Sequence, residues 1–262
     1  MLIFAHRGLK KELPENSLEG FILSWQSGFG IELDIRLTAD RDFVIIHDRD
    51  PFRVTGIHGN IGKMTMTELQ KLDISKNFSG KIGPTHLPTF TEVCEAAKKD
   101  QPSGQKMAIH MKLDEQSETG LQKLVHIFQK YGLHKQAFIF DLTLESAGKI
   151  KKMDRGIEVA ISVGEKNYTD TIYTYAELKD HKHEFDFVWW DEWQEQGSIY
   201  NQQMAEQIHA DGKPIFTISP ELHKAHGHPQ AEKGFTDLWR QLVAWDVDGI
   251  CTDDPKLLTK FL

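Results

Sequence analysis

Cysteine is scarce in this sequence, and long apolar runs are absent. The 262 residues include two cysteines, Cys94 and Cys251, which stand far apart in no CxxC pair. Neither a disulfide framework nor a zinc–thiolate site is indicated, and we interpret both as buried thiols in a reducing compartment. No run is long enough to cross a membrane, and the opening MLIFAHR lacks the pattern of a signal peptide. We expect a soluble, cytoplasmic protein without stable membrane anchoring.

An excess of positive charge is also missing. The chain has 31 basic and 39 acidic side chains and a net charge of -8. Nucleic acids select basic surfaces, so we do not expect one as the main partner, although a local cationic pocket for a small phosphate is compatible with this balance. The hydrophobic fraction of 39% is ample for a core, and we expect one domain over residues 1–262. The oligomeric state stays open.

Residues 31–35, IELDI, are the most informative stretch. Apolar and acidic side chains alternate with period two, which is typical of a strand with two different faces. Glu32 and Asp34 share one face, about 7 Å apart, and repel each other unless a cation lies between them or one takes up a proton. A divalent cation with oxygen ligands would neutralise both, whereas an exposed acidic edge is the alternative.

Short strands and helices alternate along the rest of the chain. Residues 43–48 form a hairpin arm of the second strand, because the connection before them is too short for a helical crossover. The Gly-rich residues from about 51 to 88 form a small insertion after that strand. The pattern predicts an α/β fold, a (β/α)8 TIM barrel with its chemistry at the carboxyl ends of the strands. We expect its strands near residues 2–6, 30–35, 106–112, 136–141, 157–163, 185–190, 213–219 and 248–252, with a weak helix at 173–179.

Polar side chains end the first three predicted strands. His6 and Arg7 end the first, His47 ends the hairpin arm of the second, and His110 and Lys112 lie on the third with period-two spacing. Any one of these could be a structural residue. Because the carboxyl ends of barrel strands share one mouth, we expect them all to meet Glu32 and Asp34 there.

The order of these motifs resembles the glycerophosphodiester phosphodiesterase family. The ordered set carries the resemblance, since any single dipeptide is too common to be a signal. The likeness spans the chain and is densest near its start and its end. The matching stretches are AHRG at 5–8, PENSL at 14–18, ELD at 32–34, VIIHD at 44–48, LPTF at 87–90 and VDGICTDDP at 247–255.

This resemblance implies metal-dependent hydrolysis of a glycerophosphodiester, a small-molecule substrate, to glycerol 3-phosphate and an alcohol. It also implies a place in glycerol and lipid metabolism. Glu32 and Asp34 would bind a divalent metal such as Ca²⁺, Mg²⁺ or Mn²⁺. Glu15 matches a family position near the metal site, or else caps the first helix.

The resemblance also assigns His6 and His47 as the acid/base pair, with Arg7 and Lys112 holding the phosphate oxygens. The reaction needs cationic residues at the phosphate, because attack on an anionic diester requires charge neutralisation. In-line displacement requires proton removal and proton delivery on opposite sides, which suits two histidines. The sequence leaves open which histidine is the acid, and whether water or the substrate's own glycerol hydroxyl attacks.

The third strand departs from the family pattern. The family usually has Glu-x-Lys there, and this chain has His110-Met111-Lys112. One hypothesis is that His110 still ligates the metal and shifts its preference towards a transition metal or Mg²⁺. The alternative is that His110 only hydrogen-bonds Asp34.

Three residues are candidates for the substrate wall: Trp193 after the sixth strand, Phe216 where the family often has tryptophan, and Glu15. Glu221, just beyond the seventh strand, is a candidate for an extra polar contact at the mouth. We interpret the histidine-rich residues 223–228 as a solvated loop and not a metal site. Two rival functions remain: a phosphodiesterase for a lysophospholipid or a sugar- or nucleotide-linked polyol phosphate, and a catalytically silent barrel that binds a phosphate ligand.

Overall fold

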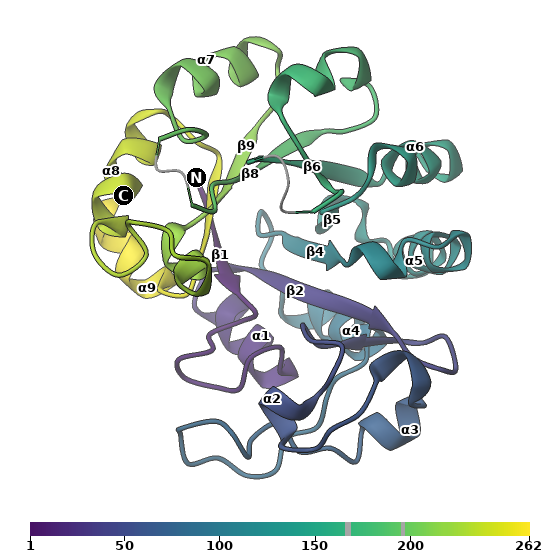
Figure 1. Ribbon diagram of the computed structural model, residues 1–262. Coiled ribbons are helices and arrows are strands. Elements are labelled where there is room, and N and C mark those ends of the chain that lie inside the picture. The colour runs from purple at the N-terminus through teal and green to yellow at the C-terminus, as the bar shows by residue number, and fades with distance from the viewer. Residues whose placement is uncertain (166–168, 195–196) are drawn as a thin grey trace.

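Parallel strands close into a barrel in this computed structural model, which describes residues 1–165, 169–194 and 197–262. Within these residues eight parallel strands form the ring, because β1 pairs with both β10 and β2 (Figure 1). The predicted (β/α)8 barrel is confirmed. In order around it lie β1 (Leu2–His6), β2 (Gly30–Leu37), β4 (Met107–Met111), β5 (Ala137–Phe140), β6 (Glu158–Gly164), β8 (Phe187–Asp191), β9 (Ile215–Ile218) and β10 (Gly249–Thr252).

Two short strands lie outside this ring. β3 (Phe43–Ile45) runs antiparallel to β2, so the expected hairpin arm is confirmed. β7 (Ile172–Tyr173) pairs with the end of β6. The helix expected at 173–179 is instead this strand followed by a 3-10 helix, Tyr175–His181. A capping box of Thr174 and Glu177 starts that turn, but its hydrogen bonding has the tighter 3-10 pattern.

Helices surround the barrel (Figure 1). Five of them begin where a side chain accepts a hydrogen bond from the first helical turn, which satisfies an otherwise unpaired N–H. These caps are Ser17, Thr89, Ser117, Thr143 and Asn201. Among the described residues, no helix has both the length and the apolarity that crossing a bilayer requires. The ring consists of α1 (Leu18–Gln26), α4 (Phe90–Asp100), α5 (Glu118–Tyr131), α6 (Leu144–Met153), α7 (Gln202–Ala210), α8 (Phe235–Ala244) and α9 (Pro255–Leu258).

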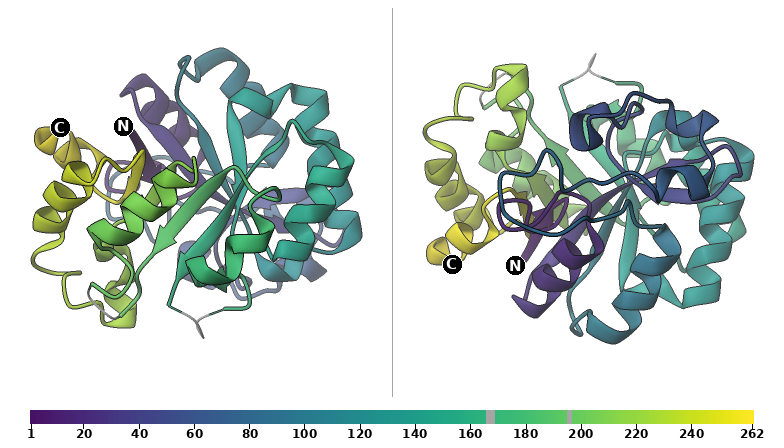
Figure 2. Two further views of the ribbon diagram at one scale, coloured as in Figure 1. Left: turned by 90° about the horizontal axis from the view of Figure 1, so that it is seen from above. Right: turned by 90° about the horizontal axis from the view of Figure 1, so that it is seen from below.

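The predicted insertion, which we call the 51–88 segment, lies between β3 and α4 on one side of the barrel (Figures 1 and 2). It carries α2 (Phe52–Thr55), a 3-10 turn (Ile61–Lys63) and α3 (Met66–Leu69). The segment has a small core of its own, which anchors it to the hairpin arm. That core contains Val44, Ile46, Ile61, Met66, Leu69, Leu72, Ile74 and Leu87.

Successive side chains along each strand point to opposite faces, so the barrel has one apolar core outside the strands and another inside them. Outward side chains such as Ile31, Leu33 and Ile35 pack against the helices. Inward side chains form an aromatic cluster inside the barrel, which includes Phe138 and Trp189. Further along β2 and β4 the inward positions become polar, at Glu32 and at His110. The barrel is therefore filled with aromatic rings up to the level where polar side chains begin.

Candidate active site

One cavity of about 570 Å³ brings together side chains from the strand ends and the loops after them. Asp34 is 1% exposed and does not itself line the cavity. Because each strand contributes one or two side chains, the cavity depends on closure of the barrel. The predicted residues that line it are His6, Arg7, Glu32, His47, His110, Lys112 and Trp193.

The two carboxylates of β2 are buried and differ in charge state. Burial, followed by the neighbouring charge of Asp34, raises the pKa of Glu32 to about 7. Burial would also raise the pKa of Asp34, but Lys112, His47 and Arg7 outweigh it and hold that pKa well below its usual range. At neutral pH Asp34 is therefore ionised, while Glu32 readily takes up a proton when no cation is present.

Asn16 is a site residue that sequence reasoning missed. It directly precedes the cap of α1, Ser17, whose side chain accepts a hydrogen bond from the backbone N–H of Gly20. Asn16 Nδ2 instead donates to Asp34 Oδ2 at 3.0 Å. No periodicity signals such a contact between a loop and a strand.

His110 contacts carboxylates through both ring nitrogens. Its Nδ1 lies 3.0 Å from Asp34 Oδ1 and 3.8 Å from Glu32 Oε1. Its Nε2 lies 2.9 Å from Asp141 Oδ2. Burial and Lys112 favour the neutral ring, but the hydrogen bonds to Asp141 and Asp34 outweigh them and raise the pKa of His110. Both sequence hypotheses for His110 are compatible with these distances.

The donor set fits a divalent cation. Glu32, Asp34 and His110 each offer one ligand atom, and these atoms lie within 4.8 Å of one another. Asp34 Oδ1 is buried, with Lys112 Nζ 2.9 Å and His110 Nδ1 3.0 Å away. A buried carboxylate oxygen beside a second carboxylate and an imidazole is a donor set that suits a metal ion.

Each of the two candidate catalytic histidines is paired with an aspartate. His6 Nδ1 lies 2.7 Å from Asp253 Oδ1, and His47 Nδ1 lies 2.7 Å from Asp48 Oδ1. Burial lowers the pKa of His6 to about 3, with smaller contributions from Arg7 and Lys10. Burial also lowers the pKa of His47, against the opposing effects of the Asp34 charge and the hydrogen bond with Asp48. If each Nδ1 donates to its aspartate, each Nε2 is left as the atom available for proton transfer.

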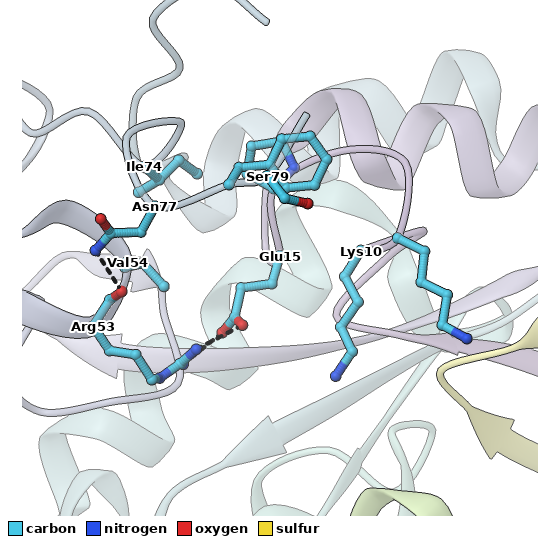
Figure 3. Close-up of a pocket in the computed structure, with 10 residues that line it drawn as sticks. Lys10, Glu15, Arg53, Val54, Ile74, Asn77 and Ser79 are labelled. Carbon is cyan, nitrogen blue, oxygen red and sulfur yellow. Dashed lines mark hydrogen bonds and ion pairs between the residues drawn. The ribbon is translucent and has the colours of Figure 1, made fainter. Parts of the chain in front are cut away.

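A chain of ion pairs connects Arg7 to the 51–88 segment. Arg7 lies 3.2 Å from Asp34 Oδ2 and donates to Glu15 Oε1 at 3.1 Å. Glu15 accepts two hydrogen bonds from Arg53, at 2.7 and 2.6 Å (Figure 3). Arg53 also donates to Asp48 Oδ2 at 2.5 Å. Glu15 therefore neither caps the helix nor lines the main cavity. It links a candidate phosphate-binding arginine to Arg53, which sequence reasoning missed.

A second hollow of about 450 Å³ lies between the loop after β1 and the 51–88 segment (Figure 3). Lys10, Lys11 and Arg53 line it together with Val54, Ile74 and Phe78. Each of the three cations already pairs with a carboxylate, of Asp253, Asp254 and Glu15 respectively.

The opposite wall of the main cavity corrects one sequence interpretation. His223 and His228 are 5% and 4% exposed, and they contact Asp191 and Glu192. The histidine-rich residues therefore form an exposed loop only at 224–227, whereas the histidines at both ends are buried. Their carboxylate partners come from the end of β8 and the residue after it, which no local pattern reveals. Trp193 stacks on His223 with ring centroids 4.5 Å apart, so it forms part of this wall.

Phe216 and Glu221 lie elsewhere than expected. Phe216 is 3% exposed and packs against Phe4 and Phe138 inside the barrel, below the polar level. It belongs to the core, and the residue of β9 that lines the cavity is Ile218. Glu221 is turned back towards β10, where it accepts a hydrogen bond from Thr252 Oγ1.

Comparison with known proteins assigns the chain to a family. A model of the glycerophosphoryl diester phosphodiesterase family matches residues 6–257. The chain belongs to this family. A glycerophosphodiester phosphodiesterase of Caldanaerobacter subterraneus subsp. tengcongensis is 31% identical over 163 residues, which are 61% of this chain and 65% of that protein. One from Bacillus altitudinis is 40% identical over 94 residues, which are 36% of this chain and 38% of that protein.

These two alignments span less than two thirds of the relatives' own lengths. The fold likeness extends further. A solved phosphodiesterase from Oleispira antarctica, in complex with the product sn-glycerol-3-phosphate, matches 100% of this chain and 96% of its own with a TM-score of 0.76. At 20% identity this likeness concerns the fold.

Proposed function

We propose that this protein is a metal-dependent glycerophosphodiester phosphodiesterase that releases glycerol 3-phosphate and an alcohol. The observation that carries the proposal is the pair of aspartate-backed histidines, His6 and His47, in one cavity with two cations and a metal-binding donor set. Family membership supports the reaction class. The product bound by the related Oleispira antarctica phosphodiesterase supports the substrate class.

Arg7 and Lys112 neutralise the phosphate oxygens in this mechanism. Both are cations beside the cavity, and both are held in place by the buried Asp34. Arginine presents a planar fork and lysine a mobile point charge, so the two can contact different oxygens of one phosphate. Glu15 restrains the guanidinium of Arg7 and thereby limits the directions in which it can donate.

The histidines move the protons. One accepts the proton of the attacking hydroxyl at Nε2, and the other donates a proton to the leaving alcohol from its Nε2. Asp253 and Asp48 hold the two rings by their Nδ1 atoms and stabilise the charged form that each ring passes through. Attack by water fits this arrangement directly, and attack by the glycerol hydroxyl of the substrate fits it when water then opens the cyclic phosphate that this attack forms.

Glu32, Asp34 and His110 would hold the divalent metal, which we propose to be Mg²⁺, Mn²⁺ or Ca²⁺. When bound, the ion would supply Lewis-acid stabilisation of charge on the phosphate oxygens. We further propose that residues 1–262 act as one domain. A cytoplasmic location and a role in glycerol and lipid metabolism remain predictions.

The test is release of glycerol 3-phosphate from glycerophosphocholine and glycerophosphoethanolamine by metal-stripped protein titrated with Mg²⁺, Mn²⁺ and Ca²⁺. We expect one ion to restore turnover, and we expect His47→Ala to lose turnover by about 100-fold or more while still binding glycerol 3-phosphate. Cleavage of an aryl phosphodiester alone would favour a lysophospholipid or a sugar- or nucleotide-linked substrate. No turnover of either substrate type would contradict the enzyme and favour a phosphate-binding barrel.

A further inference from the structure

Asp141 is a half-buried carboxylate at the cavity for which the proposed mechanism has no use. It follows β5 directly and lines the cavity. Its backbone has a φ of 62°, in the left-handed region that costs a residue with a Cβ free energy. Two hydroxyls fix one of its oxygens, since Thr171 Oγ1 lies 2.6 Å and Ser162 Oγ 3.3 Å from Oδ1. The other oxygen is left to face His110.

The contact with His110 determines which ring nitrogen carries a proton. Nε2 of His110 lies 2.9 Å from Asp141 Oδ2, and an ionised carboxylate can only accept. A proton therefore stays on Nε2. In the neutral ring this places the lone pair on Nδ1, which is the nitrogen that faces the β2 carboxylates.

Lys112 lies closer to Nδ1 of His110 than to Nε2, as this tautomer requires. Its Nζ lies 2.9 Å from Nδ1 and 3.4 Å from Nε2. An ammonium group has donors and no acceptor, so the contact is a hydrogen bond when Nδ1 carries a lone pair. The ring also stacks on Phe140, with centroids 4.7 Å apart and planes at 28°, which restricts rotation. Three neighbours thus hold one ring orientation.

We propose that Asp141 is a positioning residue that fixes the tautomer and orientation of His110, so that Nδ1 is presented to a divalent metal. The proposal rests on the metal site of the proposed function. It explains how His110 can act as an oriented ligand, because an imidazole needs a partner on its far nitrogen for that role. With one nitrogen and two carboxylate donors, the site favours Mn²⁺ over Ca²⁺.

The experiment compares the metal-stripped protein with its Asp141→Asn variant. An asparagine amide can donate to Nε2 as well as accept from it, so the proton is no longer held on Nε2 and the lone pair is no longer held on Nδ1. We expect Mn²⁺ affinity, measured by calorimetry, to fall by about 10- to 100-fold. We also expect pulsed electron paramagnetic resonance of bound Mn²⁺ to show hyperfine coupling to a directly bound ¹⁴N in the wild type and not in Asp141→Asn.

Two further variants make the test specific. Asp114→Asn removes a negative charge at the same cavity, where Asp114 is exposed and pairs with Arg49, and it should leave Mn²⁺ affinity and the ¹⁴N coupling unchanged. Thr171→Val removes the hydroxyl that holds Asp141, and it should weaken Mn²⁺ binding in the same direction but by less. The valine variant keeps the proposal testable if Asp141→Asn does not fold.

A double substitution should reverse the direction in which Asp141→Asn changes metal affinity. His110→Glu places a third carboxylate beside Asp141, so adding Asp141→Asn to that variant should strengthen Ca²⁺ binding by relieving repulsion. If Asp141 had a merely structural role, Asp141→Asn would weaken metal binding both in the wild type and in the His110→Glu variant.

The outcomes separate this inference from the proposed function. Wild-type protein that binds none of the three ions overturns the metal site and this inference together. Wild-type protein that binds Mn²⁺ without ¹⁴N coupling leaves the metal site intact and overturns the role of Nδ1, since the ring then only bridges Asp34 and Asp141. Equal affinity and equal coupling in the wild type and Asp141→Asn overturn the role of Asp141 alone.

Discussion

Glu32 is the residue whose ionisation opposes folding most directly when no metal is bound. Its pKa rises from 4.5 to about 7 in the fold, first because it is buried and second because Asp34 lies beside it. A raised carboxyl pKa means that the folded state binds the proton more tightly than the unfolded state. The resulting stability is fully present below pH 4.5 and is lost as the pH rises through about 7.

We therefore predict that Glu32→Gln stabilises the metal-free protein at pH 8 and has little effect at pH 4. The expected gain at pH 8 is about 1–3 kcal/mol in the free energy of unfolding. Urea unfolding at both pH values measures it. Saturating Mn²⁺ is the control, since the cation should neutralise Glu32 in the wild type and remove the advantage. An equal gain at the two pH values would contradict the assignment.

At the level of single residues, the strand patterns predicted the inward polar positions well. Glu32 and His110 could be placed because period-two spacing fixes a face. Asp253 and Asp141 received no role, because they contact histidines 247 and 31 residues away. Hydrogen bonds across such distances depend on which strands become neighbours, which no local pattern contains.

The 51–88 segment contributes one side chain to the site. Arg53, on α2, holds Asp48 and Glu15 at once. Asp48 supports His47, and Glu15 supports Arg7, so one arginine stabilises both a candidate catalytic group and a candidate phosphate ligand. This role gives the segment a function beyond covering the barrel.

Arg53→Met should lower kcat by about 10- to 100-fold, which corresponds to the loss of a charge-assisted hydrogen bond. The kcat of Arg53→Lys should lie between those of the wild type and Arg53→Met, because lysine keeps the charge and loses the paired contact with Glu15. Steady-state kinetics with a pH profile of kcat/KM measures both variants. Lys63→Met, at an exposed position of the same segment, is the matched control. Full activity and an unchanged profile in Arg53→Met would show that the segment does not support the site.

For the molecule as a whole, closure of the barrel depends on the aromatic cluster within it. Phe138 lies at the centre of this cluster, with ring centroids of Phe4, Phe187, Trp189 and Phe216 between 5.1 and 5.8 Å away. These rings come from different strands, so they tie opposite sides of the barrel together below the cavity.

Phe138→Ala should destabilise the protein by about 3–5 kcal/mol, because the cavity left among rigid rings cannot close. Phe52→Ala removes the same atoms from an exposed position on α2 and should change stability by less than about 0.5 kcal/mol. Chemical denaturation followed by circular dichroism compares the two. Similar losses for both variants would mean that the inner cluster does not dominate stability.

The sequence by itself determined the elements and most of the inward polar positions. Alternation along strands and caps at helix starts are local consequences of backbone geometry, so residues close in sequence suffice to predict them. The tertiary structure decided the partners: Asp253 for His6, Asp141 for His110, Arg53 for Glu15, and a buried setting for His223. These contacts exist because closing β1 on β10 and folding the 51–88 segment back bring distant residues to one mouth. Burial there then sets which groups carry charge.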